Sequence, residues 1–398
     1  MLLSPPAAPA VETPASVSTP ALVRPKLFRA LHVINGEHYS GAERVQDLLA
    51  EWLPAFGYEV GLASLLPGRF AACRQATHAP LVEHAMRSRL DLRPSRAIAR
   101  RVRDEGYDII HAHTPRSLVI AATAAHRTGV PLVYHVHSPA SRDSTRRFTN
   151  LANDSTERWF ARSAKRLITV SPTLTDHMLK RGFKPDRVRC VMNGVPTLPE
   201  DSPGARRRRA PVGPLVVGMV ALFRPRKGTE VLLEALASLR SRGHDVHLRA
   251  IGPFETPEYE QELHALADRL AINDRVQWIG FTNDVPAELA RIDTLALPSL
   301  FGEGLPMVVL EAMAAGLPVV ATRCEGTAEA ILHRETGLLV EPGSVSQLTD
   351  ALEELAAGQI EYETTSIAAR ERHADRFSAE AMARQVAAVY DDVLRGRG

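Results

Sequence analysis

Short apolar runs alternate with longer segments of helical periodicity along most of the chain. The first series places apolar runs at 28–34, 59–64, 107–111, 131–135, 166–170 and 187–191, with predicted helices at 41–52, 95–104 and 117–127. The second series places runs at 215–220, 246–251, 276–279, 294–299 and 317–322, with predicted helices at 229–241, 258–270, 285–291, 306–315, 327–333 and 345–357. Strands that alternate with helices in this way form parallel sheets covered by helices. The pattern therefore predicts an α/β protein with two parallel-sheet domains.

Changes in composition mark the domain boundaries. Residues 1–26 are mainly proline, alanine, serine and threonine without a periodic apolar face, which predicts a disordered tail rather than a signal peptide. Residues 200–214 are rich in proline and glycine and contain four consecutive arginines, which predicts a linker. The chain thus divides into domains at 27–199 and 215–375, followed by a C-terminal segment at 376–398. Two such domains would place their strand ends face to face across a cleft, where binding sites are common.

The composition narrows the class of protein and of partner. The 398 residues carry a net charge of +2, so the overall charge does not point to nucleic acid. The three cysteines lie far apart in sequence, which favours a reducing compartment and no disulfide or zinc framework. The most apolar stretch, 305–321, contains Glu311 and two prolines and changes from helical to strand periodicity, so we do not expect it to span a membrane. We expect a cytoplasmic protein.

One carboxylate lies within the predicted helix at 306–315 and another lies just before it. Pro306 suits the first helical position and Gly316 suits the residue past the end, so Glu303 falls in the preceding loop and Glu311 in the helix. The neighbours of Glu311 are apolar on nearly every face of this helix, which predicts that it is buried. A buried carboxylate needs hydrogen-bond donors, and none is near within the helix. A ligand rich in hydroxyls would supply them.

The loops at the strand ends of the second domain favour a phosphate ligand. The start of the same helix points the N–H groups of Gly304, Leu305 and their neighbours out of the carboxyl end of a strand, where phosphates bind in open α/β sheets. Arg224, Arg226 and Lys227 follow the first strand of this domain, and cations beside a helix N-terminus favour a pyrophosphate. A solvated basic turn is the alternative interpretation. Together these loops predict a site for a nucleoside diphosphate.

In the first domain, a glycine-containing loop follows the first predicted strand. The loop NGEHYSGAE, residues 35–43, places Gly41 at the start of a helix but lacks the GxGxxG spacing of a dinucleotide site. Gly41 therefore serves either the turn itself or a close backbone approach to a phosphate or an acceptor.

Two His-x-His pairs fall at the carboxyl ends of neighbouring predicted strands, His111 with His113 and His135 with His137. Four histidines in this arrangement could hold zinc, but no further type of ligand is spaced to match. Structural hydrogen bonding beneath the loops is the alternative for at least two of them. His113, nearer the loop tip, is the candidate to hydrogen-bond a sugar hydroxyl or carbonyl. An arginine cluster at 142–147 is either a solvated face or a contact for an anionic acceptor or a membrane surface.

These motifs resemble those of a known family. The segment from Glu303 to Glu311 resembles the E-x7-E motif of retaining glycosyltransferases of family 4, which have the GT-B fold. The sequence around this segment also resembles that family across the second domain. It reads ALPSLFGEGLPMVVLEAMAAGLPVVAT, followed by GTAEAI and ETGLLVEPG. The shorter motifs SGAE, DIIHAH, ITVSP, NGV and PRKG occur in the family's order, so the resemblance covers most of residues 27–398.

The resemblance implies a fold and an activity. The fold is two Rossmann-like domains that face each other across a cleft, with a final helix at 379–394 that crosses back onto the first domain through Phe377 and Tyr390. The activity is transfer of a hexose-type sugar from a nucleotide-diphosphate sugar to a glycan, lipid-linked or small-molecule acceptor, in the synthesis of cell-surface polysaccharide or glycoconjugate. No metal or other cofactor is expected, and peripheral contact with the inner membrane face is possible for such an enzyme.

The resemblance also implies roles for single residues. Glu311 would bind the ribose of the donor, and Lys227 would bind its diphosphate. Glu303 and the backbone that follows it, residues 304–306, would meet the donor sugar, and His113 would contact that sugar near the reacting carbon.

The chain departs from the family pattern at two places in the predicted site. The family usually has a glycine and an arginine shortly before the Lys-Gly pair, where this chain has residues 220–222, VAL, so Arg224 or Arg226 would replace the missing arginine. Ser40 stands where a second glycine is common.

The alternative functions are a GT-B-fold epimerase or phosphorylase and a non-catalytic sugar-nucleotide binder. A phosphorylase would need a lysine for pyridoxal phosphate, and Lys227 is the only lysine in the second domain.

Overall fold

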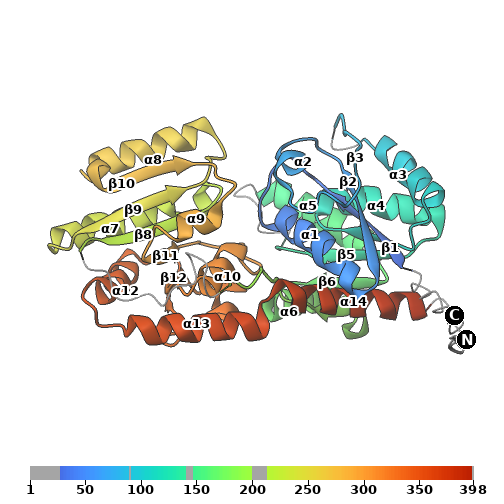
Figure 1. Cartoon of the computed structure of the whole chain (residues 1–398). Helices are drawn as coiled ribbons and strands as arrows, with labels where there is room; N and C mark the ends of the chain where they lie inside the picture. The colour runs from blue at the N-terminus through green and yellow to red at the C-terminus, as the bar shows by residue number, and fades with distance from the viewer. Residues whose placement is uncertain (1–26, 89–90, 140–146, 200–212, 397–398) are drawn as a thin grey trace, which may run out of the picture.

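The computed structural model describes residues 27–88, 91–139, 147–199 and 213–396, which form two α/β lobes (Figure 1). The first lobe contains a parallel sheet with strand order β3-β2-β1-β4-β5-β6-β7. Its strands are β1 Phe28–Ile34, β2 Tyr58–Ser64, β3 Leu81–Glu83, β4 Ile109–Ala112, β5 Leu132–Val136, β6 Arg166–Thr169 and β7 Val188–Cys190. Its helices are α1 Gly41–Trp52, α2 Arg69–Cys73, α3 Arg93–Asp104, α4 Pro115–Thr128, α5 Arg147–Ala161 and α6 Pro172–Lys180.

The second lobe contains a parallel sheet with strand order β10-β9-β8-β11-β12-β13. Its strands are β8 Leu215–Val220, β9 Val246–Ile251, β10 Val276–Gly280, β11 Thr294–Leu297, β12 Val319–Thr322 and β13 Leu338–Val340. Its helices are α7 Thr229–Ser241, α8 Pro257–Arg269, α9 Val285–Leu289, α10 Met307–Ala314, α11 Thr327–Ala330, α12 Val345–Ala356 and α13 Tyr362–Arg376. The predicted fold class, two parallel-sheet α/β domains, is confirmed.

Single elements differ from the sequence predictions at their ends. Pro306 is the N-cap residue of α10 rather than its first helical residue, because its ψ of 121° is extended. The short elements α2, β3 and β13 were not predicted, and neither were α6 and α13. The predicted tail at 1–26, most of the predicted linker at 200–214 and most of the arginine cluster at 142–147 lie outside the described residues. Within the described part of the chain, every helix is too short or too polar to cross a membrane.

The last helix, α14 Ala379–Arg395, runs beneath the first lobe, after α13 has followed the second (Figure 1). It packs against α1 and the 3-10 turn η1 Leu53–Phe56. The turn between α13 and α14 is held by backbone hydrogen bonds from Val195 to Phe377 and from Ala379 to Val195. Phe377 and Tyr390 are both buried.

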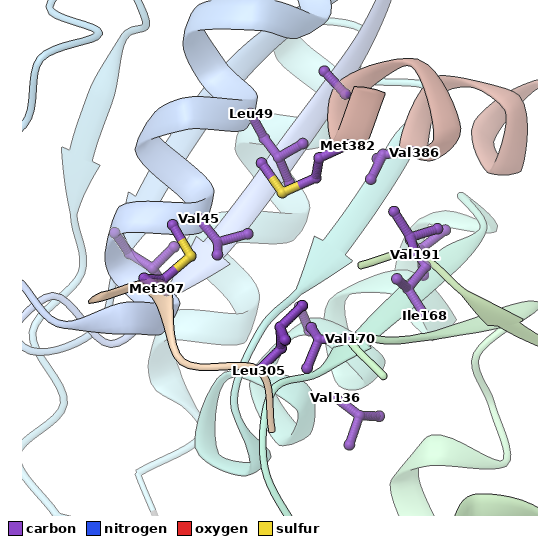
Figure 2. Packing of buried hydrophobic residues seen from close by; sticks show 14 of the residues in the cluster. Val45, Leu49, Val136, Ile168, Val170, Val191, Leu305, Met307, Met382 and Val386 are labelled. Atoms are coloured by element: carbon purple, nitrogen blue, oxygen red, sulfur yellow. The ribbon is translucent and has the colours of Figure 1, made fainter. Parts of the chain in front are cut away.

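The two lobes share apolar packing where the loop before α10 meets the first lobe. Figure 2 shows Leu305 beside Val170 and Met307 beside Val45, and all four belong to one buried cluster. Asn193 adds a polar contact, since its side-chain amide donates to the backbone oxygen of Leu305 at 2.8 Å. The loop that carries Glu303 is therefore fixed against the strand ends of the other domain.

Candidate active site between the two domains

The two sheets place their topological switch points at one cleft. The strand order reverses between β1 and β4 in the first sheet and between β8 and β11 in the second, and ligands bind at such points in open α/β sheets. The loops that follow these strands line a cavity of about 1180 Å³. All the candidate residues from the sequence lie on its wall: Gly41, His113, Arg224, Arg226, Lys227, Glu303, Gly304, Leu305, Pro306 and Glu311.

Glu303 and Lys227 form a buried ion pair on the wall contributed by the second domain. The ammonium of Lys227 donates to Oε1 of Glu303 at 2.5 Å, and the hydroxyl of Ser299 donates to the same oxygen at 2.6 Å. Burial by itself would raise the pKa of Glu303, but the charges of Lys227 and Arg226 outweigh it and lower that pKa to about 2. Burial lowers the pKa of Lys227, and the charge of Glu303 opposes that shift. Glu303 is therefore a carboxylate that accepts hydrogen bonds and does not supply a proton.

The two arginines near Lys227 have different partners. Arg226 donates to the backbone oxygens of Phe301 and Gly302 at 3.3 and 3.0 Å, and its guanidinium lies 3.6 Å from Glu303. Arg224 pairs with Glu255 at 3.5 Å. Arg226 thus holds the loop that carries Glu303, whereas Arg224 interacts with the loop after β9.

The loop before α10 approaches the first domain at Gly304. A Cβ atom added to Gly304 would lie 1.9 Å from the backbone oxygen of His137, closer than any real contact. On the other side of this loop, the N–H groups of Gly302 and Glu303 both donate to the carboxylate of Glu325 at 3.1 Å. The loop is thus held in place by a backbone contact that requires glycine and by a carboxylate that the sequence analysis did not single out.

Gly304→Ala should destabilise the protein by about 1–3 kcal/mol, because the added methyl group overpacks a backbone contact between the domains. Gly41→Ala is the matched control, since its Cβ would meet Cγ of Met307 at an ordinary 3.8 Å. Urea unfolding of the two variants measures the difference. Equal stabilities would contradict the packing at Gly304.

Glu311 is buried on α10, as its apolar neighbours predict, and its partner comes from the other domain. The guanidinium of Arg44 on α1 pairs with Oε1 of Glu311. The second oxygen, Oε2, is buried and has no hydrogen-bond partner among the described residues. We expected a ligand to supply the hydrogen-bond donors to Glu311. This expectation is wrong for Oε1, which pairs with Arg44, and it remains a prediction for Oε2.

Four buried histidines and the half-buried His137 form a cluster below the opposite wall, on the first domain. His113 is 1 % exposed, and its ring nitrogens lie 3.1 Å from Nε2 of His137 and 3.2 Å from Nδ1 of His32. The hydroxyl of Tyr390 on α14 lies 2.9 Å from Nε2 of His32 and 2.6 Å from Nδ1 of His111. This chain of hydrogen bonds fixes the ring of His113 from behind.

Burial decides the charge of these rings. It lowers the pKa of His32 and of His137 to about 3 and holds the pKa values of His111, His113 and His135 well below 6.5. The rings are therefore neutral at physiological pH. A neutral His113 can donate one hydrogen bond and accept another, and His137 and His32 engage both of its nitrogens, so contact with a sugar hydroxyl requires the exchange of one of these bonds.

Sequence reasoning missed four residues that complete the site. Arg44, His32 and Tyr390 come from α1, β1 and α14, and Glu325 follows β12. Each of these residues contacts the site from a distant position in the sequence, so no local sequence pattern indicates the contact.

Comparison with known sequences identifies both halves of the chain. The family described as "Glycosyltransferase Family 4" matches residues 39–197, and the family described as "Glycosyl transferases group 1" matches residues 205–372. A D-inositol 3-phosphate glycosyltransferase of Corynebacterium glutamicum is 30 % identical over 72 % of this chain and 73 % of its own length. A GDP-mannose-dependent alpha-(1-6)-phosphatidylinositol monomannoside mannosyltransferase of Mycobacterium tuberculosis is 34 % identical over 49 % of this chain and 52 % of its own.

Solved structures agree with this assignment. HepE of Anabaena in complex with UDP-glucose superimposes with a TM-score of 0.80 and 25 % identity, covering 92 % of this chain and 99 % of HepE. WaaG, a glycosyltransferase involved in lipopolysaccharide biosynthesis, superimposes with a TM-score of 0.70 and 20 % identity, covering 91 % of this chain and 99 % of WaaG, a likeness of fold alone. The chain therefore belongs to glycosyltransferase family 4 and is a glycosyltransferase with the GT-B fold.

Proposed function

We propose that this glycosyltransferase moves a hexose-type sugar, with retention of anomeric configuration, from a nucleoside diphosphate sugar bound in the cleft. The observation that carries the proposal is the arrangement of its walls. A buried Lys227–Glu303 pair and Glu311, one of whose oxygens has no partner among the described residues, line one side, and neutral His113 lines the other. The acceptor is a glycan, a lipid-linked sugar or a small molecule, and the route is synthesis of cell-surface polysaccharide or glycoconjugate.

The second domain binds the donor in this proposal. Lys227 donates to the diphosphate and stabilises the charge that develops on the departing nucleoside diphosphate. Glu311 accepts hydrogen bonds from the ribose through Oε2, the oxygen that Arg44 leaves free. Glu303 stays ionised because its pKa is about 2, so it accepts hydrogen bonds from hydroxyls of the donor sugar.

The first domain completes the reaction site. Nδ1 of His113 exchanges its hydrogen bond with His137 for one that it donates to the donor sugar near the reacting carbon, while Nε2 keeps its hydrogen bond with His32. Gly41 allows the start of α1 to approach the donor or the acceptor. The charge on the diphosphate is neutralised by Lys227 and by backbone N–H groups, so we propose that transfer requires no metal and no other cofactor.

The relatives support a nucleotide-sugar donor without fixing its base. One relative is named for GDP-mannose, and HepE was solved with UDP-glucose. A panel of UDP, GDP and ADP sugars, assayed for release of nucleoside diphosphate in buffer with EDTA, tests the proposal. Turnover of at least one donor by the wild type, with loss in Glu303→Gln, is expected.

The same assay separates the alternatives. A non-catalytic binder would bind a nucleotide sugar without release of nucleoside diphosphate, and an epimerase would convert the sugar without an acceptor. A phosphorylase would show absorbance above about 320 nm from a lysine-bound pyridoxal phosphate. Lys227 fits the diphosphate role better, because its ammonium already pairs with Glu303.

Glu311→Ala should weaken binding of the donor's nucleotide by roughly 10- to 150-fold, because hydrogen bonds to a charged group are worth about 1.5–3 kcal/mol. Arg44→Ala is the matched variant, since it breaks the same ion pair but leaves the carboxylate for the ribose. Calorimetry with the nucleoside diphosphate should find the larger loss in Glu311→Ala. Equal losses would mean that the ion pair between the domains, and not the ribose contact, explains the effect.

A further inference from the structure

The histidine cluster contains more ring nitrogens than its hydrogen bonds use. Nε2 of His111 and both ring nitrogens of His135 are buried and have no hydrogen-bond partner among the residues that the structure describes. A buried polar atom left in this state is costly, and such atoms in native proteins are commonly satisfied by a water or an ion. These unpaired nitrogens can therefore donate electron pairs to a ligand such as a metal ion.

Two groups of three histidines have ring nitrogens within 4.8 Å of one another, His32 with His111 and His113, and His113 with His135 and His137. In the first group, Tyr390 occupies nitrogens of two rings. In the second group, Nδ1 of His113 lies 3.1 Å from Nε2 of His137, close to the separation of about 3.4 Å between two nitrogens that bind one tetrahedral zinc. The second group is the better fit.

We infer that His113, His135 and His137 form a binding site for a single late transition metal ion such as Zn²⁺. Three neutral imidazoles with a fourth position left to water is a common zinc arrangement. His113 and His137 line the cavity, so an ion can enter from the cleft. The other nitrogen of His113 is held by Nδ1 of His32, which takes the place of the carboxylate, backbone carbonyl or water that usually accepts the second ring N–H of a zinc-binding histidine. For all three rings to bind one ion, the ring of His135 must rotate. This rotation breaks no hydrogen bond among the described residues, because both nitrogens of His135 are unpaired there.

The ion would inhibit rather than assist the enzyme. A zinc ion on Nδ1 of His113 leaves that nitrogen without the N–H that we assign to the donor sugar and occupies the same space, so bound zinc and donor sugar exclude each other. This consequence rests on the proposed function, whereas zinc binding itself rests only on the geometry of the three rings. Mg²⁺ prefers oxygen ligands and should not bind here.

Equilibrium dialysis of the full chain, with no affinity tag, tests the site. The wild type should retain one zinc ion after dialysis against free Zn²⁺, retain no Mg²⁺, and unfold at a higher temperature with zinc present. His137→Gln at the half-buried mouth and His135→Gln should each weaken zinc binding by more than roughly 10-fold, since changes to outer partners alone cost about 10- to 100-fold. His126→Gln, an exposed histidine on α4, is the control and should bind as the wild type does.

Failure to retain zinc in the wild type would overturn the proposal, and so would equal retention by wild type and His137→Gln. His137→Gln decides the matter even if His135→Gln does not fold, because His137 is only half-buried. Zinc binding without inhibition of nucleoside diphosphate release would leave the metal site in place and contradict the assigned role of His113.

Discussion

Replacement of His113 by alanine should lower kcat by about 10²- to 10³-fold, the usual cost of removing one preorganised donor from a transition state. The ring reaches the cleft while its nitrogens are oriented by His137 and His32, so its geometry is set before a substrate binds. The hydrogen bond proposed for it strengthens as the sugar separates from the diphosphate. Binding of the nucleoside diphosphate should change little, because that part of the donor lies on the opposite wall.

Steady-state turnover and calorimetry on the same variant measure the two effects separately. His126→Ala provides the control for loss of an exposed histidine on the same domain. EDTA in the buffer keeps adventitious zinc from lowering the activity of the wild type. A loss of nucleotide affinity as large as the loss of kcat would contradict the placement of His113 at the reacting sugar.

Lys227→Ala should reduce affinity for the nucleoside diphosphate by roughly 10- to 150-fold, because it removes a charge-assisted hydrogen bond worth about 1.5–3 kcal/mol. Lys227 is the cation that lies closest to Glu303, at 2.5 Å, while Arg226 is 3.6 Å away and committed to the backbone of the loop. The variant therefore removes the cation that we assign to the diphosphate and leaves Arg226 bound to the loop.

The nucleoside without phosphates is the internal control for this variant. If Lys227 acts on the diphosphate, affinity for the nucleoside should be the same in wild type and Lys227→Ala, and only the nucleoside diphosphate should lose affinity. An equal loss for both ligands would show that the substitution has disturbed the loop of Glu303. Arg224→Ala, which breaks a pair with Glu255, should have the smaller effect on the nucleoside diphosphate.

Periodicity predicted those elements whose burial pattern is strong. Helix α7 and strand β8 fall at the predicted residues, and α10 differs only at its ends. Helix α13 was missed because its buried face consists of small or polar residues, such as Thr365, Ser366 and Ala369, rather than a stripe of leucine or valine. Strand β13 has three residues, which is too short for a period to appear.

The site was predictable as a set of loops but not as a set of contacts. Residue types at strand ends located Lys227, Glu303 and His113 on one cavity wall or the other. They could not show that Arg44 pairs with Glu311, because 267 positions separate the two residues and the contact exists only when both domains are assembled. The same holds for Tyr390, which reaches the histidines from the end of the chain.

The anomeric configuration of the product tests the central claim most directly, because it reports on the reaction itself. The donor found in the nucleotide-sugar panel should be incubated with its acceptor, and the first-formed product observed by proton NMR before any slow rearrangement. The account predicts a product with the same anomeric configuration as the donor, formed by the wild type and formed more slowly by His113→Ala. A product with the opposite configuration would contradict it.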